Sequence, residues 1–122
     1  MSYMMRGQTL VAMPGNPGTV VSEPIVLDQS NRITVVPFVH SRCSPNADPT
    51  FKYKSQVSID GITWVDQGLD ISAINPGTGP LPIQQGNVSG SLCRLVAIWM
   101  VDGVNPGTGG ITFDLSVRAD RV

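Results

Sequence analysis

The segment from Phe51 to Val65 constrains the fold most, because its alternation and its turn residues predict the same structure. From Phe51 to Asp60, apolar or small residues alternate with polar ones, which is the pattern of a strand with one buried face. Asp60-Gly61 then has the composition of a two-residue type I′ turn. The segment therefore predicts a β-hairpin. With that turn, its inner side would carry Val57 opposite Trp64 and Ile59 opposite Ile62.

The composition favours strands over helices. Charged residues are 14% of the 122 residues, against about 25% in a typical domain, and only two of them are Lys and one is Glu. Lys and Glu favour helices, whereas the 13 Gly and 10 Pro interrupt them. The length is that of one domain. We therefore expect one all-β domain over residues 1–122, with residues 1–6 as an N-terminal arm.

Further runs of alternating or apolar residues, separated by clusters of turn-forming residues, predict more strands. Residues 69–74 form either a short strand or a single helical turn. Seven or eight strands of this kind predict a two-sheet antiparallel sandwich of jelly-roll or Greek-key type. Besides the hairpin, the expected strands cover residues 7–13, 20–27, 32–40, 92–101 and 110–119.

Two of the expected strands, 32–40 and 92–101, are apolar on both faces. A strand of a two-sheet sandwich buries one face in the core, so the other face needs cover from a loop or another subunit. The low charge and this pattern favour a subunit that packs against copies of itself or within a larger assembly. The Gly- and Pro-rich residues 75–90 form a possible contact loop, with Asn75, Pro76, Gly77, Leu81 and Ile83 as candidate contact residues.

The tetrapeptide Asn-Pro-Gly-Thr occurs three times, at residues 16–19, 75–78 and 105–108. Proline presets φ for the first central position of a type II turn, and glycine supplies the positive φ of the second. Each copy follows an apolar run. The motif therefore predicts recurring turns, and its irregular spacing argues against a solenoid repeat.

The sequence offers few groups for catalysis or metal binding. His40 is the one histidine, which leaves a pairing with an Asp or with Cys43 and excludes multi-histidine metal sites. Asp66 and Asp70 could meet at a turn around calcium, but no further oxygen ligands accompany them. We expect no enzymatic activity and no cofactor. For the two cysteines we expect a loop thiol at Cys43 and a buried thiol at Cys93, with their pairing left open.

Charge, hydropathy and aromatic residues bear on the partners. A net charge of −1 argues against nucleic-acid binding, and no apolar run approaches the roughly 20 residues of a membrane span. The first residues lack the apolar segment and cleavage site of a signal peptide. Trp64, Trp99 and Tyr53 could stack on sugar rings, but all three fall on inward positions of strands, where aromatic residues fill the core.

The segment Ser58-Ile-Asp-Gly-Ile-Thr-Trp64, the apolar strand 92–101 and the glycine-led strand 110–118 resemble small β-sandwich structural proteins of phage virions, such as head decoration or tail components. The likeness implies a non-enzymatic capsid, capsid-decoration or tail protein that forms homo-oligomers and contacts other particle subunits. Its implied location is the virion, assembled in the host cytoplasm. Asp-Gly-x-Thr-Trp hairpins also occur in sugar-binding modules, so the alternative is a carbohydrate-binding or adhesion module with a glycan partner.

Overall fold

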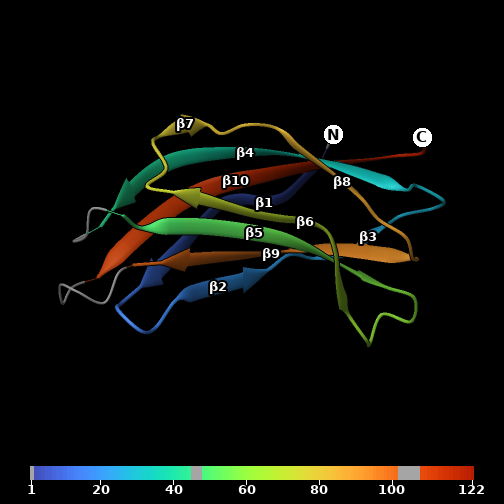
Figure 1. Cartoon of the computed structure of the whole chain (residues 1–122), viewed down its shortest axis with the longest axis horizontal. Helices are drawn as coiled ribbons and strands as arrows, with labels where there is room; N and C mark the ends of the chain where they lie inside the picture. Colours follow the sequence, from blue (N-terminus) through green and yellow to red (C-terminus); the bar gives the residue numbers. More distant parts are fainter. Residues whose placement is uncertain (1, 45–47, 102–107) are drawn as a thin grey trace.

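The computed structural model describes residues 2–44, 48–101 and 108–122. These residues form ten strands in two five-stranded antiparallel sheets that are stacked face to face (Figure 1). The predicted all-β sandwich is confirmed, with more strands than the seven or eight expected because several short strands line the sheet edges. The three ranges contain no helix, and hence none that could span a membrane.

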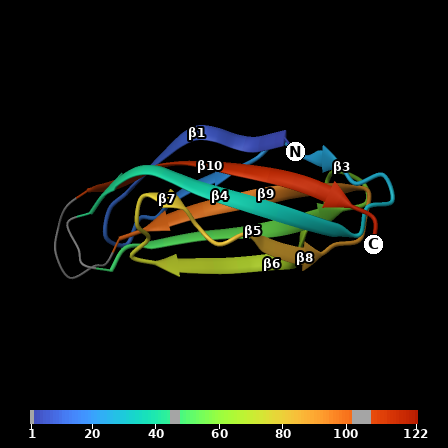
Figure 2. The same ribbon diagram turned by 90° about the horizontal axis from the view of Figure 1, so that it is seen from above.

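Sheet I comprises β1 (Ser2–Ala12), β4 (Arg32–Cys43), β7 (Gly79–Pro80), β8 (Gln84–Asn87) and β10 (Gly109–Asp120). Sheet II comprises β2 (Gly18–Val21), β3 (Ile25–Val26), β5 (Thr50–Ser58), β6 (Val65–Ile74) and β9 (Leu92–Met100). In sheet I, β10 lies between β1 and β4, and β7 and β8 pair with the other edge of β4. In sheet II, β9 lies between β5 and the pair β2 and β3, and β6 follows β5 at the edge (Figure 2).

The core lies between the sheets and is built by residues that alternate along the long strands. Trp99 of β9 and Phe51 of β5 are both 0% exposed, and the Phe51 ring centroid lies 4.8 Å from that of Phe113 on the opposite sheet. Burying a side chain of this size stabilises the fold by roughly 1.5–3 kcal/mol. The inward residues predicted for β10 are confirmed at 1% exposed or less: Ile111, Phe113, Leu115 and Val117.

Strand β1 begins at Ser2, so the predicted arm is wrong for residues 2–6, which pair with β10. The Met5 side chain is 4% exposed and belongs to the core, where its backbone pairs with Leu115. The ladder shifts register on both sides of Met5, and Gly7 has a φ of +57°. A bulged strand lacks the strict alternation by which strands are recognised in a sequence, which is why these residues were missed.

The predicted hairpin is present as β5 and β6, but its loop covers residues 59–64 instead of Asp60 and Gly61 alone. Asp60 Oδ1 accepts a hydrogen bond from the Ile62 N–H at 2.8 Å, which stabilises the wider loop. Gly61 has a φ of +78°, whereas Asp60 is not at positive φ, so the type I′ turn is wrong. Ile59 and Ile62 are consequently 84% and 83% exposed and do not face the core.

Two other predicted segments can be compared with the observed strands. Pro24 lies between β2 and β3 and divides the expected strand 20–27, because proline cannot donate to a ladder; both pieces pair with β9. Residues 69–74 belong to β6, which decides between the strand and the helical turn in favour of the strand.

Residues 75–90 do not cover an outer face of the sandwich. They contribute β7 and β8, which pair with β4 and so extend sheet I sideways. A Cβ atom on Gly86 of β8 would lie 2.9 Å from the carbonyl carbon of Gly68 in β6. Glycine at this position therefore lets the edges of the two sheets approach each other, and the passage closes one side of the sandwich.

The Asn-Pro-Gly-Thr motif does not form the predicted type II turn in its first two copies. Gly18 and Gly77 lack the positive φ that this turn requires. The chain reversal beside the first copy lies at Pro14-Gly15, where Gly15 has a φ of +79°. Gly18 instead needs to be small, because a Cβ atom there would lie 2.6 Å from the Val11 carbonyl oxygen. Most of the third copy lies outside the described residues.

Candidate interaction face

The outer side of sheet II follows from the register of its strands. The even-numbered residues of β9 point away from the core, and residues paired with them on neighbouring strands point the same way. We call this surface the sheet II face. It is formed by Thr19, Val21, Val26, Thr50, Lys52, Lys54, Gln56, Ser58, Asp66, Asp70, Ser72, Ile74, Leu92, Arg94, Val96, Ile98 and Met100.

The centre of the sheet II face is apolar. Val96 is 6% exposed, and the adjacent Ile98 is half-buried. On the neighbouring strands, Val21 and Val26 are 47% and 71% exposed. The prediction that residues 92–101 are apolar on both faces and central in their sheet is therefore confirmed. A strip of this kind, rimmed by polar residues, is typical of contact surfaces.

The outer side of sheet I is more polar. Strand β4 presents Val36, which is half-buried, and Phe38, which is 39% exposed. The prediction of a second strand that is apolar on both faces therefore holds only in part. The neighbouring outward residues are polar: Thr9, Ser41, Thr112, Asp114, Ser116 and Arg118.

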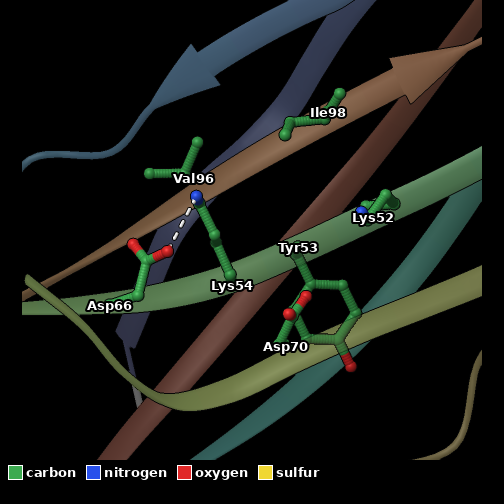
Figure 3. Close-up of a pocket in the computed structure, with 7 residues that line it drawn as sticks. All are labelled: Lys52, Tyr53, Lys54, Asp66, Asp70, Val96 and Ile98. Carbon is green, nitrogen blue, oxygen red and sulfur yellow. Dashed lines mark hydrogen bonds and ion pairs between the residues drawn. The ribbon is translucent and has the colours of Figure 1, made fainter.

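A chain of polar contacts crosses the sheet II face. Lys54 Nζ lies 3.1 Å from Asp66 Oδ2, an ion pair shown in Figure 3, and Gln56 Nε2 donates to Asp66 Oδ1 at 2.9 Å. The Gln56 amide and, next, the Lys54 ammonium lower the pKa of Asp66 below its ordinary value. Arg94 Nε donates to Gln56 Oε1 at 2.9 Å. The alternation of residues 51–60 predicts that Lys54 and Gln56 point outward, but it carries no signal for their partners on other strands.

Trp64 lies on this outer side, so the prediction that it lies in the core is wrong. Its ring centroid is 4.1 Å from the Arg94 guanidinium carbon, which is a cation–π distance, and the side chain is half-buried. The longer loop changes the register so that Val57 pairs with Val65, and Trp64 falls outside the ladder. The loop also approaches Leu92, since a Cβ atom on Gly61 would lie 3.5 Å from its Cδ1.

Lys52 and Asp70 are the two charged residues of the face that have neither an ion pair nor a side-chain hydrogen bond among the described residues. Lys52 is half-buried and Asp70 is exposed. Both line the shallow pocket of Figure 3, together with Val96 and Ile98. Lys54 pairs with Asp70 and Lys52 with Ser72 in the β5–β6 ladder, so Lys52 and Asp70 lie diagonally on neighbouring strands.

The other aromatic candidates are inside the protein. Trp99 and Tyr53 are 0% and 1% exposed, as their inward positions predicted, so neither is available to stack on a sugar ring. The Trp99 Nε1 and Tyr53 hydroxyl have no hydrogen-bond partner within the described ranges. Burial raises the pKa of Tyr53 to about 12.

The candidate contact loop is only partly exposed. Asn75 has a φ of +51° and accepts a hydrogen bond from Arg42 at 2.6 Å, which fixes the start of the passage. Pro76 is buried and Leu81 packs against the core, whereas Ile83 is 62% exposed. Gly77 is exposed with no atom near its Cβ position.

The His–Asp pairing considered from the sequence exists, on the outer side of sheet I. His40 Nε2 lies 2.9 Å from Asp114 Oδ2, while Asp114 Oδ1 accepts the Gly7 N–H at 2.5 Å. Partial burial alone would raise the pKa of Asp114, but the Gly7 N–H, His40 and Arg6 together lower it below its ordinary value. The pair thus fastens the bulge of β1 to β10.

The metal and thiol predictions concern other positions. No group of three or more His, Cys, Asp or Glu side chains that could hold a metal ion occurs in the described part of the chain, which includes Asp66 and Asp70. Cys93 is buried, as expected, whereas Cys43 is the last residue of β4 and not part of a loop. Cys43 is exposed, and both cysteines are free thiols. Burial raises the pKa of Cys93 to about 11, which makes its thiolate scarce at neutral pH.

Comparisons with known proteins give information on the fold. No protein-family model and no curated protein matches the chain. Among solved structures, a chain from the structure of infectious bursal disease virus, Gx strain, matches over 98% of this chain with a TM-score of 0.53 and 9% identity, and this chain spans 32% of its length. A CBM36 carbohydrate-binding module in complex with calcium and xylotriose has a TM-score of 0.39 and 11% identity, covering 90% of this chain and 78% of that one. A pectin-binding module has a TM-score of 0.37 and 16% identity, covering 88% and 73%. The virus match shows that the chain has a β-sandwich fold also found in a viral protein.

Proposed function

We propose that this protein is a non-enzymatic structural subunit that packs against copies of itself and other subunits on a larger particle, a phage virion assembled in the host cytoplasm. The observation that carries this proposal is the number of large apolar side chains at the surface of a chain with only 14% charged residues. Each is at least 39% exposed: Val11, Met13, Val21, Val26, Phe38, Ile59, Ile62, Val65, Ile74, Ile83 and Val122.

Single exposed apolar residues are common on soluble proteins, so their grouping is what supports a contact role. At one end of the sandwich, the β5–β6 loop holds Ile59 and Ile62, and Val65 follows at 59% exposed (Figure 1). A shallow groove there is lined by Val57, Ile59 and Val65. Removing such surface from water yields about 25 cal/mol per Å², which favours packing against a partner.

The fold supports a virion role, because the chain shares its sandwich with a chain from a virus structure. The proposal is non-enzymatic, and the His40–Asp114 pair has a structural role that fits it, because Asp114 accepts the Gly7 N–H through its second oxygen and so holds the bulge of β1.

Light scattering after size-exclusion chromatography, over a wide range of concentrations, tests the proposal. We expect masses that are multiples of 13.0 kDa, together with cosedimentation with virions of the source phage. A mass of 13.0 kDa at every concentration and no cosedimentation would overturn it.

A second candidate function is carbohydrate binding or adhesion, and the surface position of Trp64 beside Arg94 favours it. The Arg94 guanidinium beside this ring is hydrogen-bonded to the Gln56 amide, and an aromatic ring with polar groups nearby is suited to a sugar. Because Trp99 is buried, a glycan on this face would perturb mainly the fluorescence of Trp64. Fluorescence that stays unchanged across a glycan panel would count against this function.

A further inference from the structure

We propose that the sheet II face is the surface by which two copies of this chain pack together, with Lys52 of each copy beside Asp70 of the other. This inference rests on the proposed self-association and names its surface and its partner. A second copy is favoured over other partners because the face carries both an apolar strip and unpaired charges of opposite sign.

The apolar strip explains why this face and not the outer side of sheet I would be covered. Val96, Ile98 and Val21 lie side by side on β9 and β2, with Val21 paired opposite Val96. The corresponding side of sheet I carries the large apolar residues Val11, Val36 and Phe38 among hydroxyl and charged residues. Contact between two sheet II faces would therefore remove more apolar surface from water.

The charges of the face divide into satisfied and unsatisfied groups. Lys54 has Asp66 at 3.1 Å, and Arg94 has Gln56 and the Trp64 ring. Lys52 and Asp70 have no ion pair in the described part of the chain. One is positive and one is negative, so a surface that meets a copy of itself can pair both.

The register allows one rotation to make both pairs. Lys52 and Asp70 lie on neighbouring strands, two residues apart along the strand direction. A two-fold axis in the interface, perpendicular to the line that joins Lys52 and Asp70 and passing through its midpoint, exchanges these two positions. Asp70 of the second copy then faces Lys52 of the first, and the reverse.

Sedimentation velocity on the full chain gives the first test. We expect a wild-type species of twice 13.0 kDa, and we expect Ile98→Lys to shift it to the monomer. Val36→Lys is the matched control, because Val36 is also a half-buried, β-branched residue on the outer side of a strand flanked on both edges. Circular dichroism checks that both variants fold. A dimer that persists in folded Ile98→Lys overturns the proposal.

Charge exchange tests the pairing with exposed residues that are not part of the core. Lys52→Glu and Asp70→Lys should each raise the dimer Kd by about tenfold or more, because like charges then face each other across the interface. An equimolar mixture of the two variants should recover a wild-type Kd. In each mixed dimer, the introduced glutamate faces the introduced lysine, and the retained Asp70 of one copy faces the retained Lys52 of the other. A mixture as weak as its components overturns the pairing.

These outcomes separate the inference from the proposed function. Wild-type protein that is monomeric alone but cosediments with virions overturns the sheet II dimer and leaves the structural role standing. Protein that neither dimerises nor cosediments overturns both.

Discussion

Asp60 and Gly61 stabilise the β5–β6 loop by different means. The Asp60 carboxylate accepts hydrogen bonds from the N–H groups of Thr63 and Ile62 and from the Ser58 hydroxyl, and these contacts lower its pKa below the ordinary value. Gly61 supplies the positive φ and donates its N–H to Ser58 Oγ at 2.8 Å. The loop is therefore specified by side-chain hydrogen bonds as well as by backbone conformation.

Replacing Gly61 tests the contribution of the backbone. Gly61→Val should lower the free energy of unfolding by about 1–3 kcal/mol, because a β-branched residue resists a φ of +78°. Gly77→Val is the control, since Gly77 is exposed, lacks positive φ and has open space at its Cβ position. The urea midpoint of Gly61→Val should be lower than that of Gly77→Val. Equal midpoints would show that valine at position 61 adopts this φ without loss of stability.

The ionisation of Asp114 makes the free energy of unfolding depend on pH in the acid range. Its folded pKa lies below the ordinary value of 3.8, so its ionised form stabilises the fold. That contribution is complete above the unfolded pKa and is lost as pH falls through the folded pKa. Asp114→Asn keeps an oxygen that can accept the Gly7 N–H but does not titrate.

We therefore expect the urea midpoint of the wild type to fall more steeply between pH 5 and pH 2, a range set by the pKa of about 4 of a free Asp, than that of Asp114→Asn. Parallel pH curves for the two proteins would mean that Asp114 is not stabilised by its contacts with Gly7 and His40.

At the scale of single elements, β6 shows how a bulge is accommodated. The β5–β6 ladder shifts register between Lys54 and Gln56, and the residue between them, Ser55, is 0% exposed. Ser55 Oγ donates to the Gln67 carbonyl and accepts the Leu69 N–H at 2.8 Å. This hydroxyl replaces the ladder bonds that the bulge removes, and it places Leu69 in the core at 5% exposed.

Ser55→Ala should accordingly destabilise the protein by about 1–3 kcal/mol, because it leaves buried backbone groups of β6 unpaired. Ser116→Ala, on the half-exposed outer side of β10, is the control and should change stability by less than about 0.5 kcal/mol. Thermal or urea unfolding measures both. A neutral Ser55→Ala would indicate that β6 rearranges to regain its ladder.

At the scale of the whole molecule, the two outer faces differ in character. Sheet I is polar outside and fastened by His40 and Asp114, whereas sheet II carries an apolar strip with a polar network beside it. The two tryptophans report on the two environments, because Trp99 is fully buried and Trp64 is half-buried at the surface.

Acrylamide quenching of Trp64→Phe therefore isolates the core tryptophan. We expect its fluorescence to be several-fold less quenchable than that of the same variant unfolded in urea. Strong quenching in the native state would contradict the sandwich core. In the wild type, quenching of Trp64 should fall as concentration rises if the sheet II faces meet.

The sequence alone determined the all-β sandwich, the inward residues of β10 and the two apolar faces of β9. Alternation and composition are local properties of the sequence. The burial of a residue such as Phe113 or Trp99 can be predicted from its own hydrophobicity and its position in a period-two pattern. The hairpin was found for the same reason.

Tertiary structure decided what depends on partners distant in the chain. The outward position of Trp64 and the network from Lys54 to Arg94 arise from contacts with β6 and β9. Residues 2–6 became a strand because Met5 reached the core, and residues 75–90 became an edge of sheet I because β4 had an unpaired side. Such pairings minimise unsatisfied backbone groups over the whole molecule, and no local pattern records which edges are free.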